Sequence, residues 1–173
     1  MNRIQIVGAS GSGTSTLAKA MSEKYGYKHF DTDDYYWLPT EEPFSQARPI
    51  EDRIQLLSTD LLNHDEWVLS GSLCGWGYVF IPNFDFVIYL WLPEEIRMQR
   101  LAEREAHRYG KDIAAGGKRH RSYLKFMEWA SNYDTAGLEM RSRTLHEEWL
   151  SRLPCRVVKL EGDISIQDKL RYI

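Results

Sequence analysis

The stretch Ile4-Gln5-Ile6-Val7-Gly8-Ala9-Ser10-Gly11-Ser12-Gly13-Thr14-Ser15-Thr16-Leu17 joins a short apolar run to a glycine-rich loop and a helix-forming segment. Aligned with the phosphate-loop pattern G-x-x-x-x-G-K-[ST], it matches at Gly8, Gly13 and Ser15, and it has Thr14 in place of lysine. Glycines let successive N–H groups turn toward an anion, and the helix that follows points its positive N-terminus at the same place. The stretch therefore predicts a phosphate-binding loop.

A plain strand-to-helix turn rich in flexible residues is the alternative, but the preceding strand and the spacing from Gly8 to Thr14-Ser15 favour phosphate binding. In that interpretation the Ser15 hydroxyl contacts Mg²⁺ held between phosphates. The loop residues expected to hold the phosphates are Gly8, Ala9, Ser10, Gly11, Ser12, Gly13, Thr14, Ser15 and Thr16.

The composition is that of an ordinary globular chain. Its 173 residues can bury a core of their own, so we expect one domain over residues 1–173. The net charge of −3 gives no sign of nucleic acid or an anionic membrane as a partner. Residues 97–121, however, hold eight Lys/Arg and three acids (net +5), which leaves −8 elsewhere. A local basic patch on an acidic body suits a small anionic ligand.

Two cysteines, Cys74 and Cys155, form no disulfide framework, and no apolar run is long enough to span a membrane. We read no signal peptide at the start of the chain and expect a reduced, cytoplasmic compartment. The five histidines show no metal-ligand spacing, so a zinc site is not expected.

Strand-like and helix-like segments alternate along the chain, which predicts an α/β domain with a parallel sheet. Strands are expected at 3–7, 27–30, 67–69, 84–92 and 155–160. Helices are expected at 15–25 and 50–64, from residue 94 to a loop at 110–117, from that loop to about 153 with a break near 134–137, and at 164–172. Ligands of such sheets bind beyond the carboxyl ends of the strands. This rule brings residues 8–15, 31–34, 70–72 and 162–163 to one edge.

The helix after Pro93 carries four arginines on one face, because at about 100° per residue all four fall within roughly 80° of one another. They are Arg97, Arg100, Arg104 and Arg108. For Arg97 and Arg108 we expect a solvated surface. Arg100 and Arg104, opposite the loop, are expected to bind a triphosphate, since the planar guanidinium suits phosphate oxygens.

Two further segments are candidates for chemistry. Residues 109–121 combine glycines with a basic run and are interpreted either as a lid that excludes water or as an ordinary surface loop. Asp31 and Asp33, at the end of the second strand, are expected to hold Mg²⁺ or to accept a proton from a substrate hydroxyl. Asp34 is more typical of a turn or a helix cap.

Together with the Arg100-x-x-x-Arg104 pair, several motifs in order give the chain its resemblance to a family. They are the loop, Val87-Ile88-Tyr89-Leu90, Pro93-Glu94-Glu95-Ile96 and the turn Gly162-Asp163. The chain resembles the nucleoside monophosphate kinases, which include adenylate kinases and the related shikimate and gluconate kinases. The resemblance implies a three-layer P-loop NTPase fold: a five-stranded parallel sheet flanked by helices, with a lid at about 109–121 and an acceptor-binding segment at about 34–66.

The resemblance also implies roles. Asp31 and Asp33 match the Asp-x-Asp that small-molecule kinases carry after strand two. Catalytic roles are expected for Asp31, Asp33, Arg104 and Arg119, Mg²⁺ contacts for Ser15 and Asp33, and nucleotide contacts, besides the loop, for Arg100, Arg104, Gly162 and Asp163. Substrate contacts are expected for Asp33, Trp37, Arg48, Arg53, Gly71, Ser72 and Arg141, with Arg143 as a further cation for an anionic acceptor.

The sequence departs from the family in three places, one of which is an acceptor region that is unusually aromatic and acidic, with Trp37, Trp76, Glu41 and Glu42. Thr14 replaces the loop lysine, so Arg100 or the lid residues Lys118, Arg119 and Arg121 are the expected sources of the missing charge. The third strand ends in Ser70-Gly71-Ser72 rather than Asp-Gly, which favours a shikimate- or gluconate-type acceptor over AMP. The sequence thus predicts an ATP- and Mg²⁺-dependent phosphotransferase acting on a small metabolite or nucleotide. The alternative is a nucleotide-binding, catalytically weak module that acts through a partner protein.

Overall fold

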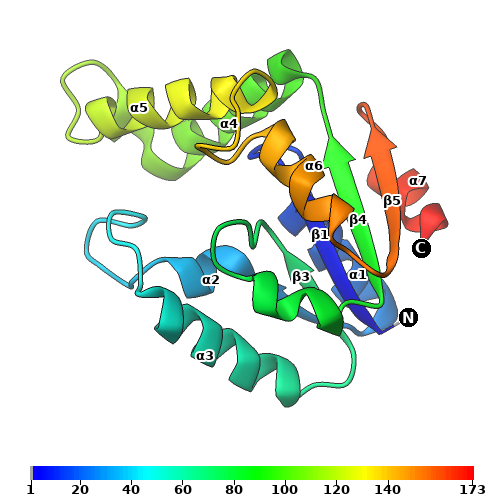
Figure 1. Cartoon of the computed structure of the whole chain (residues 1–173). Helices are drawn as coiled ribbons and strands as arrows, with labels where there is room; N and C mark the ends of the chain where they lie inside the picture. Colours follow the sequence, from blue (N-terminus) through cyan, green and yellow to red (C-terminus); the bar gives the residue numbers. More distant parts are fainter. Residues whose placement is uncertain (1) are drawn as a thin grey trace.

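The sheet is built from five parallel strands with β1 at its centre. The structure is a computed structural model that describes residues 2–173. Its strands are β1 (Arg3–Gly8), β2 (Lys28–Asp31), β3 (Trp67–Ser70), β4 (Phe86–Trp91) and β5 (Arg156–Glu161). Their order across the sheet is β2-β3-β1-β4-β5, and every pairing is parallel (Figure 1). The order reverses at β1, which is where a ligand cleft is expected in an open α/β sheet. The predicted α/β fold is confirmed.

The continuous apolar run of β4 is explained by burial on both faces. Val87 and Tyr89 pack into one hydrophobic cluster, whereas Phe86, Ile88 and Leu90 pack into another on the opposite face of the sheet. Successive side chains of a strand alternate between faces, so a strand covered on both sides is apolar at every position.

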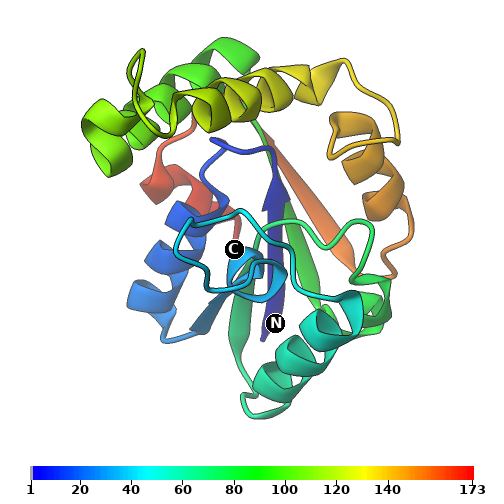
Figure 2. The same cartoon turned by 90° about the vertical axis from the view of Figure 1, so that its left-hand side faces the viewer.

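Helices cover both faces and the carboxyl edge of the sheet (Figures 1 and 2). The α-helices are α1 (Thr14–Tyr25), α2 (Thr32–Tyr36), α3 (Ile50–Leu62), α4 (Glu94–Tyr109), α5 (His120–Ser131), α6 (Arg143–Ser151) and α7 (Ile166–Lys169). Short 3₁₀ turns are η1 (Tyr78–Asn83), η2 (Gly110–Ile113), η3 (Asn132–Asp134) and η4 (Leu170–Tyr172). α1 and α7 pack on one face, α3 and α6 on the other. None of the helices within residues 2–173 is long and apolar enough to cross a bilayer.

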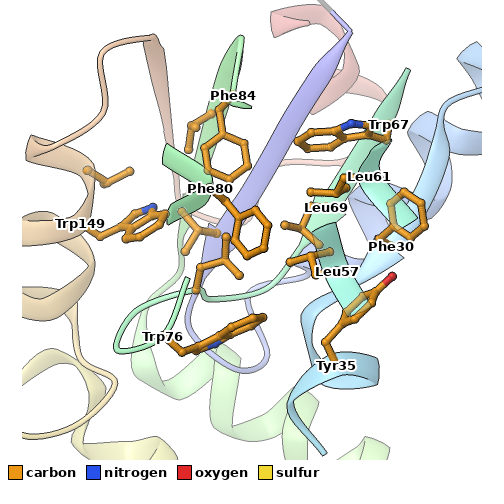
Figure 3. Close-up of a cluster of buried hydrophobic side chains, with 14 of the residues drawn as sticks. Phe30, Tyr35, Leu57, Leu61, Trp67, Leu69, Trp76, Phe80, Phe84 and Trp149 are labelled. Atoms are coloured by element: carbon orange, nitrogen blue, oxygen red, sulfur yellow. The ribbon is translucent and has the colours of Figure 1, made fainter. Parts of the chain in front are cut away.

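The two faces have different cores. The cluster beneath α3 and α6 is aromatic, and it includes Trp67, Trp76, Phe80, Phe84 and Trp149 (Figure 3). The cluster beneath α1 and α7 consists mainly of aliphatic side chains. Aromatic side chains bury large areas and pack edge to face, as Trp67 does against Phe84, so the first cluster contributes strongly to stability.

The elements differ from the sequence-based expectation in three places. α2 follows β2 directly, because the Asp31 carboxylate accepts a 3.0 Å hydrogen bond from the Asp33 N–H and caps the helix. The break between α5 and α6 extends over residues 132–142 and ends where Ser142 caps α6. The closing helix is shorter than expected and finishes as the turn η4.

Candidate functional site

The loop between β1 and α1 is shaped by close backbone packing. Gly11 and Gly13 have φ angles of 82° and 93°, in the left-handed region that favours glycine. A Cβ on Gly8 would lie 2.5 Å from the Leu90 carbonyl oxygen, and one on Gly11 would lie 2.8 Å from that of Arg97. Within residues 2–173 no side chain caps the N-terminus of α1, so its first N–H groups are left for a ligand.

A cavity of about 530 Å³ opens over this loop, at the carboxyl ends of β1, β2 and β3. Its lining joins the loop to the ends of other strands and to α4 and α7. Beyond the loop, the lining residues are Asp31, Thr32, Asp33, Gly71, Ser72, Arg100, Leu101, Arg104, Arg108, Arg141, Asp163, Ile164, Ser165, Ile166 and Lys169. The predicted convergence of strand ends at one edge is therefore realised as a single cavity.

A hydrogen-bonded group of oxygen atoms lies beside the loop. The Ser15 hydroxyl donates to Oδ2 of Asp31 at 2.6 Å, and the Ser70 hydroxyl donates to the same oxygen at 2.8 Å. His29 Nε2 lies 2.9 Å from the Ser70 oxygen. Burial lowers the pKa of His29, while the charges of Asp31 and Asp34 oppose the shift. Asp31 is thus oriented by Ser70 of the neighbouring strand β3 and by Ser15 of α1.

Asp33 stands next to this group and faces the cavity. Its carboxylate is reached by water, yet it lies deep in a cleft formed by several elements, and this partial desolvation raises its pKa. The negative charge of Asp31 raises the pKa further, whereas Arg141 and Arg104 oppose the shift. A carboxylate with a raised pKa beside cations has the properties of a general base.

Ser72, on the cavity wall, is held by a buried chain of hydrogen bonds. Its hydroxyl lies 3.0 Å from Nε2 of His146, and Nδ1 of His146 lies 2.8 Å from the hydroxyl of Tyr133. Tyr133 in turn lies 2.8 Å from the Tyr89 hydroxyl. Burial, with a smaller contribution from Arg141, lowers the pKa of His146 to about 3, so its ring is neutral near pH 7.

Three arginines of α4 reach the cavity, each close to a carboxylate. Arg100 donates to Asp163 at 2.6 Å. Arg104 contacts Glu105 at 3.0 Å, and Arg108 lies 3.8 Å from the same carboxylate. These side chains are partly exposed, so the pairs are open to competition from an anionic ligand.

Arg97 does not belong to this surface, and the expectation that it is solvated was wrong. It is fully buried, and its guanidinium donates to the carbonyls of Leu92 and Ala130 and to Asp134 at 2.8 Å. The reason is packing: η3, which supplies Asp134, covers this end of α4.

Comparison with known proteins agrees with this geometry. The AAA domain family matches residues 4–125, which is more than half of the chain. The chain belongs to the AAA domain family. A protein of Bacillus subtilis (strain 168), described as uncharacterized protein YqaC, is 47% identical over 96% of this chain and 92% of its own length.

Other relatives in sequence are cytidylate kinases, and two further kinases share the fold. The cytidylate kinase of Natronomonas pharaonis is 30% identical over 77% of this chain and 78% of its own length. The cytidylate kinase of Archaeoglobus fulgidus is 34% identical over 64% of each chain. The shikimate kinase of Aquifex aeolicus has a similar fold, with a TM-score of 0.53, 14% identity and coverage of 98% and 92%. A sugar kinase of Janibacter sp. also gives 0.53, with 12% identity and coverage of 99% and 91%. This AAA domain chain is therefore a P-loop NTPase of the kinase-like type.

In this AAA domain protein the donor set beside the loop fits Mg²⁺, which prefers oxygen ligands and keeps several of its waters. The Ser15 hydroxyl and the Asp31 carboxylate converge within 2.6 Å. The carboxylate beside Ser15 is thus that of Asp31, whereas the sequence had suggested Asp33.

Several predicted residues lie away from the cavity lining in the described part of the chain. The Arg48 guanidinium donates to the Tyr35 carbonyl, while Arg53 is buried over the ring of Tyr36. Arg119 stacks on Tyr109, 4.1 Å from its centroid, and lies 3.8 Å from Glu42. The predicted residues outside the lining are Ser12, Trp37, Arg48, Arg53, Lys118, Arg119, Arg121, Arg143 and Gly162.

Sequence reasoning missed Lys169 and His146. Lys169 lines the cavity although it is only 2% exposed, and burial lowers its pKa, an effect that Arg100 increases and Asp163 opposes. Lysine is rarely buried. Neither residue lies in a motif, and both are brought to the site by helices distant in sequence.

Proposed function

We propose that this protein transfers the γ-phosphoryl group of Mg·ATP to a hydroxyl or phosphate of a small metabolite or nucleotide. One observation carries the proposal: Ser15 of the phosphate loop contacts Asp31, and Asp33 faces the same cavity. Metal-binding oxygens and a candidate base are then adjacent, as phosphoryl transfer requires. The kinase-like relatives support this assignment.

Each end of the cavity has its own role in the proposal. The loop and the N-terminus of α1 bind the phosphates, and Ser15 with Asp31 holds Mg²⁺, which supplies charge neutralisation. Arg100 and Arg104 bind the leaving nucleotide, with Asp163 beside them. Catalysis of this kind consists mainly of positioning and electrostatic stabilisation.

At the other end, Asp33 accepts the proton of the attacking hydroxyl. Its raised pKa keeps it a stronger base than an ordinary aspartate. The positive charge of Arg141 acts on Asp33 and partly offsets the increase in its pKa. No carboxylate within residues 2–173 forms an ion pair with Arg141. With Ser72 and Gly71 beside it, this end suits an acceptor that carries both a hydroxyl and an anionic group.

Thr14 favours a second candidate, a nucleotide-binding module with weak turnover. Removing one well-placed cation from the transferred phosphate lowers rates by roughly 10²–10³. Such a protein would bind Mg·ATP and signal to a partner without efficient transfer.

Titration calorimetry with Mg·ATP, on the native protein and on Thr14→Lys, tests the proposal. We expect the native protein to bind with a Kd in the micromolar range, about −8 kcal/mol. ADP release is then measured with acceptors drawn from the chemistry of the relatives: CMP, shikimate and a set of sugars. Binding without acceptor-dependent ADP release supports the second candidate. Absence of Mg·ATP binding until lysine is restored refutes the kinase proposal.

A further inference from the structure

The phosphate loop lacks a cation at Thr14, so the positive charge near the phosphates must come from elsewhere in the cavity. Five cations line it: Arg100, Arg104, Arg108, Arg141 and Lys169. The three on α4 have carboxylates nearby, namely Asp163 for Arg100 and Glu105 for the other two. Arg141 faces Asp33 at the acceptor end. Lys169 is the remaining candidate on the side of α1.

Lys169 is built into the wall that adjoins the loop. It is the last residue of α7, and α7 packs against α1, the helix that begins within the loop (Figures 1 and 2). Its side chain is 2% exposed and still lines the cavity. Among the described residues its ammonium forms no hydrogen bond or ion pair, and only the Ser12 hydroxyl is an unpartnered side-chain atom fully shut off from solvent, so the ammonium reaches the cavity.

The charged groups facing Lys169 are Arg100 and Asp163. These two form a 2.6 Å ion pair with each other, and the repulsion of the ammonium by Arg100 exceeds its attraction to Asp163. A positive charge that is partly desolvated and has no ion-pair partner is unfavourable, and an anion placed against it recovers part of that free energy. The neighbourhood is therefore suited to an anionic oxygen.

We propose that Lys169 binds a phosphate oxygen of the donor nucleotide and supplies the positive charge that Thr14 cannot. This inference rests on the proposed function, because it takes the loop to be the phosphate site. It assigns to α7 a role that lysine at position 14 has in the phosphate-loop pattern.

Calorimetry with inorganic tripolyphosphate and with Mg·ATP tests the inference on the full-length chain. The variants are Lys169→Met, Thr14→Lys and the double variant, and Lys159→Met on the exposed side of β5 is the matched control. One charge-assisted hydrogen bond corresponds to about a 10–100-fold change in affinity. We expect Lys169→Met to weaken both ligands by this factor, the control to bind as the native protein does, and Thr14→Lys to restore binding in the Lys169→Met background.

The decisive comparison is the effect of Thr14→Lys on binding in the native protein and in the Lys169→Met variant. If Thr14→Lys strengthens binding equally with and without Lys169, the two positions act independently and the inference is wrong. It is also wrong if Lys169→Met weakens Mg·ATP but not tripolyphosphate, since the lysine then contacts the nucleoside. If the native protein binds neither ligand, the proposed function itself fails.

Thermal unfolding separates binding from folding. Removing an unpaired buried charge should leave the Tm of the ligand-free protein unchanged or raise it. Lys169→Gln, which is neutral and polar, repeats the titrations if the methionine variant is destabilised. Affinity that is unchanged in a folded Gln variant overturns the inference.

Discussion

The hydroxyl of Ser15 donates a 2.6 Å hydrogen bond to the carboxylate of Asp31. This contact links the first turn of α1 to the end of β2. In the sheet, β2 lies two strands away from β1, the strand that precedes α1. Asp31 also caps α2 through the Asp33 N–H, so a single carboxylate orients both the Ser15 hydroxyl and the start of the helix that carries Asp33.

Substitution of Asp31→Asn separates these functions. Asparagine is as good a helix cap as aspartate, so α2 and the Tm should be retained. The loss of one anionic ligand should weaken Mg²⁺-dependent ATP binding by at least about tenfold, about 1.4 kcal/mol. Calorimetry with and without Mg²⁺ measures this effect. Equal affinity of the two proteins for Mg·ATP would contradict a metal-binding role.

Asp33→Asn should abolish most of the activity while stabilising the fold. The rate should fall by about 10²–10⁴, the contribution of a general base. Because the folded-state pKa of Asp33 is raised, the charged carboxylate destabilises the folded state at neutral pH, and its removal should raise the Tm there. Below about pH 4, where the group is protonated in both states, the two Tm values should converge. A lower Tm for the variant at pH 7 would argue against the raised pKa.

His146 should make stability depend on pH. Its folded-state pKa is lowered to about 3, so the unfolded chain takes up a proton first as the pH falls. Below about pH 6.5 this residue should reduce the free energy of unfolding by up to about 1.4 kcal/mol per pH unit. Urea unfolding at several pH values, compared with His146→Gln, isolates the effect, since the other histidines titrate in both proteins. Parallel pH profiles would rule it out.

Arg97→Met should be strongly destabilising, unlike the same change further along its helix. Arg97 is buried against Asp134 and two backbone carbonyls, so its removal should lower the free energy of unfolding by about 3 kcal/mol. Arg108→Met, at a side chain that is 45% exposed, should change it by less than about 0.5 kcal/mol. Denaturant unfolding of both variants provides the test. Similar decreases in the free energy of unfolding would show that the buried Arg97–Asp134 pair contributes no more to stability than an exposed arginine does.

The fold was predictable because its signals are local. The apolar run of β4 and the glycine-rich loop after β1 each identify an element from neighbouring residues, and strand ends were placed within about two residues. The rule that parallel strands present their carboxyl ends at one edge then brought Asp31, Gly71, Ser72 and Asp163 to a common cavity.

What the sequence did not show depends on contacts between distant segments. Arg97 has the same helical spacing as Arg100 and Arg104, and only η3, some 35 residues later in the chain, makes its face an interior one. Lys169 and His146 are single polar residues on short helices, and burial gives them their properties. The α2 helix was missed because the capping carboxylate, Asp31, had been interpreted only as a functional group.

Because aromatic side chains are unevenly distributed between the two faces, the tryptophan fluorescence of the protein reports mainly on one face of the sheet. The fully or largely buried tryptophans Trp67, Trp76 and Trp149 all lie in the cluster beneath α3 and α6, whereas the cluster beneath α1 and α7 has none among the described residues. Trp129 stacks with Arg141, at the end of the cavity assigned to the acceptor. Intrinsic emission will therefore respond to acceptor binding and to repacking of α6, and it will report only weakly on a nucleotide held against α1.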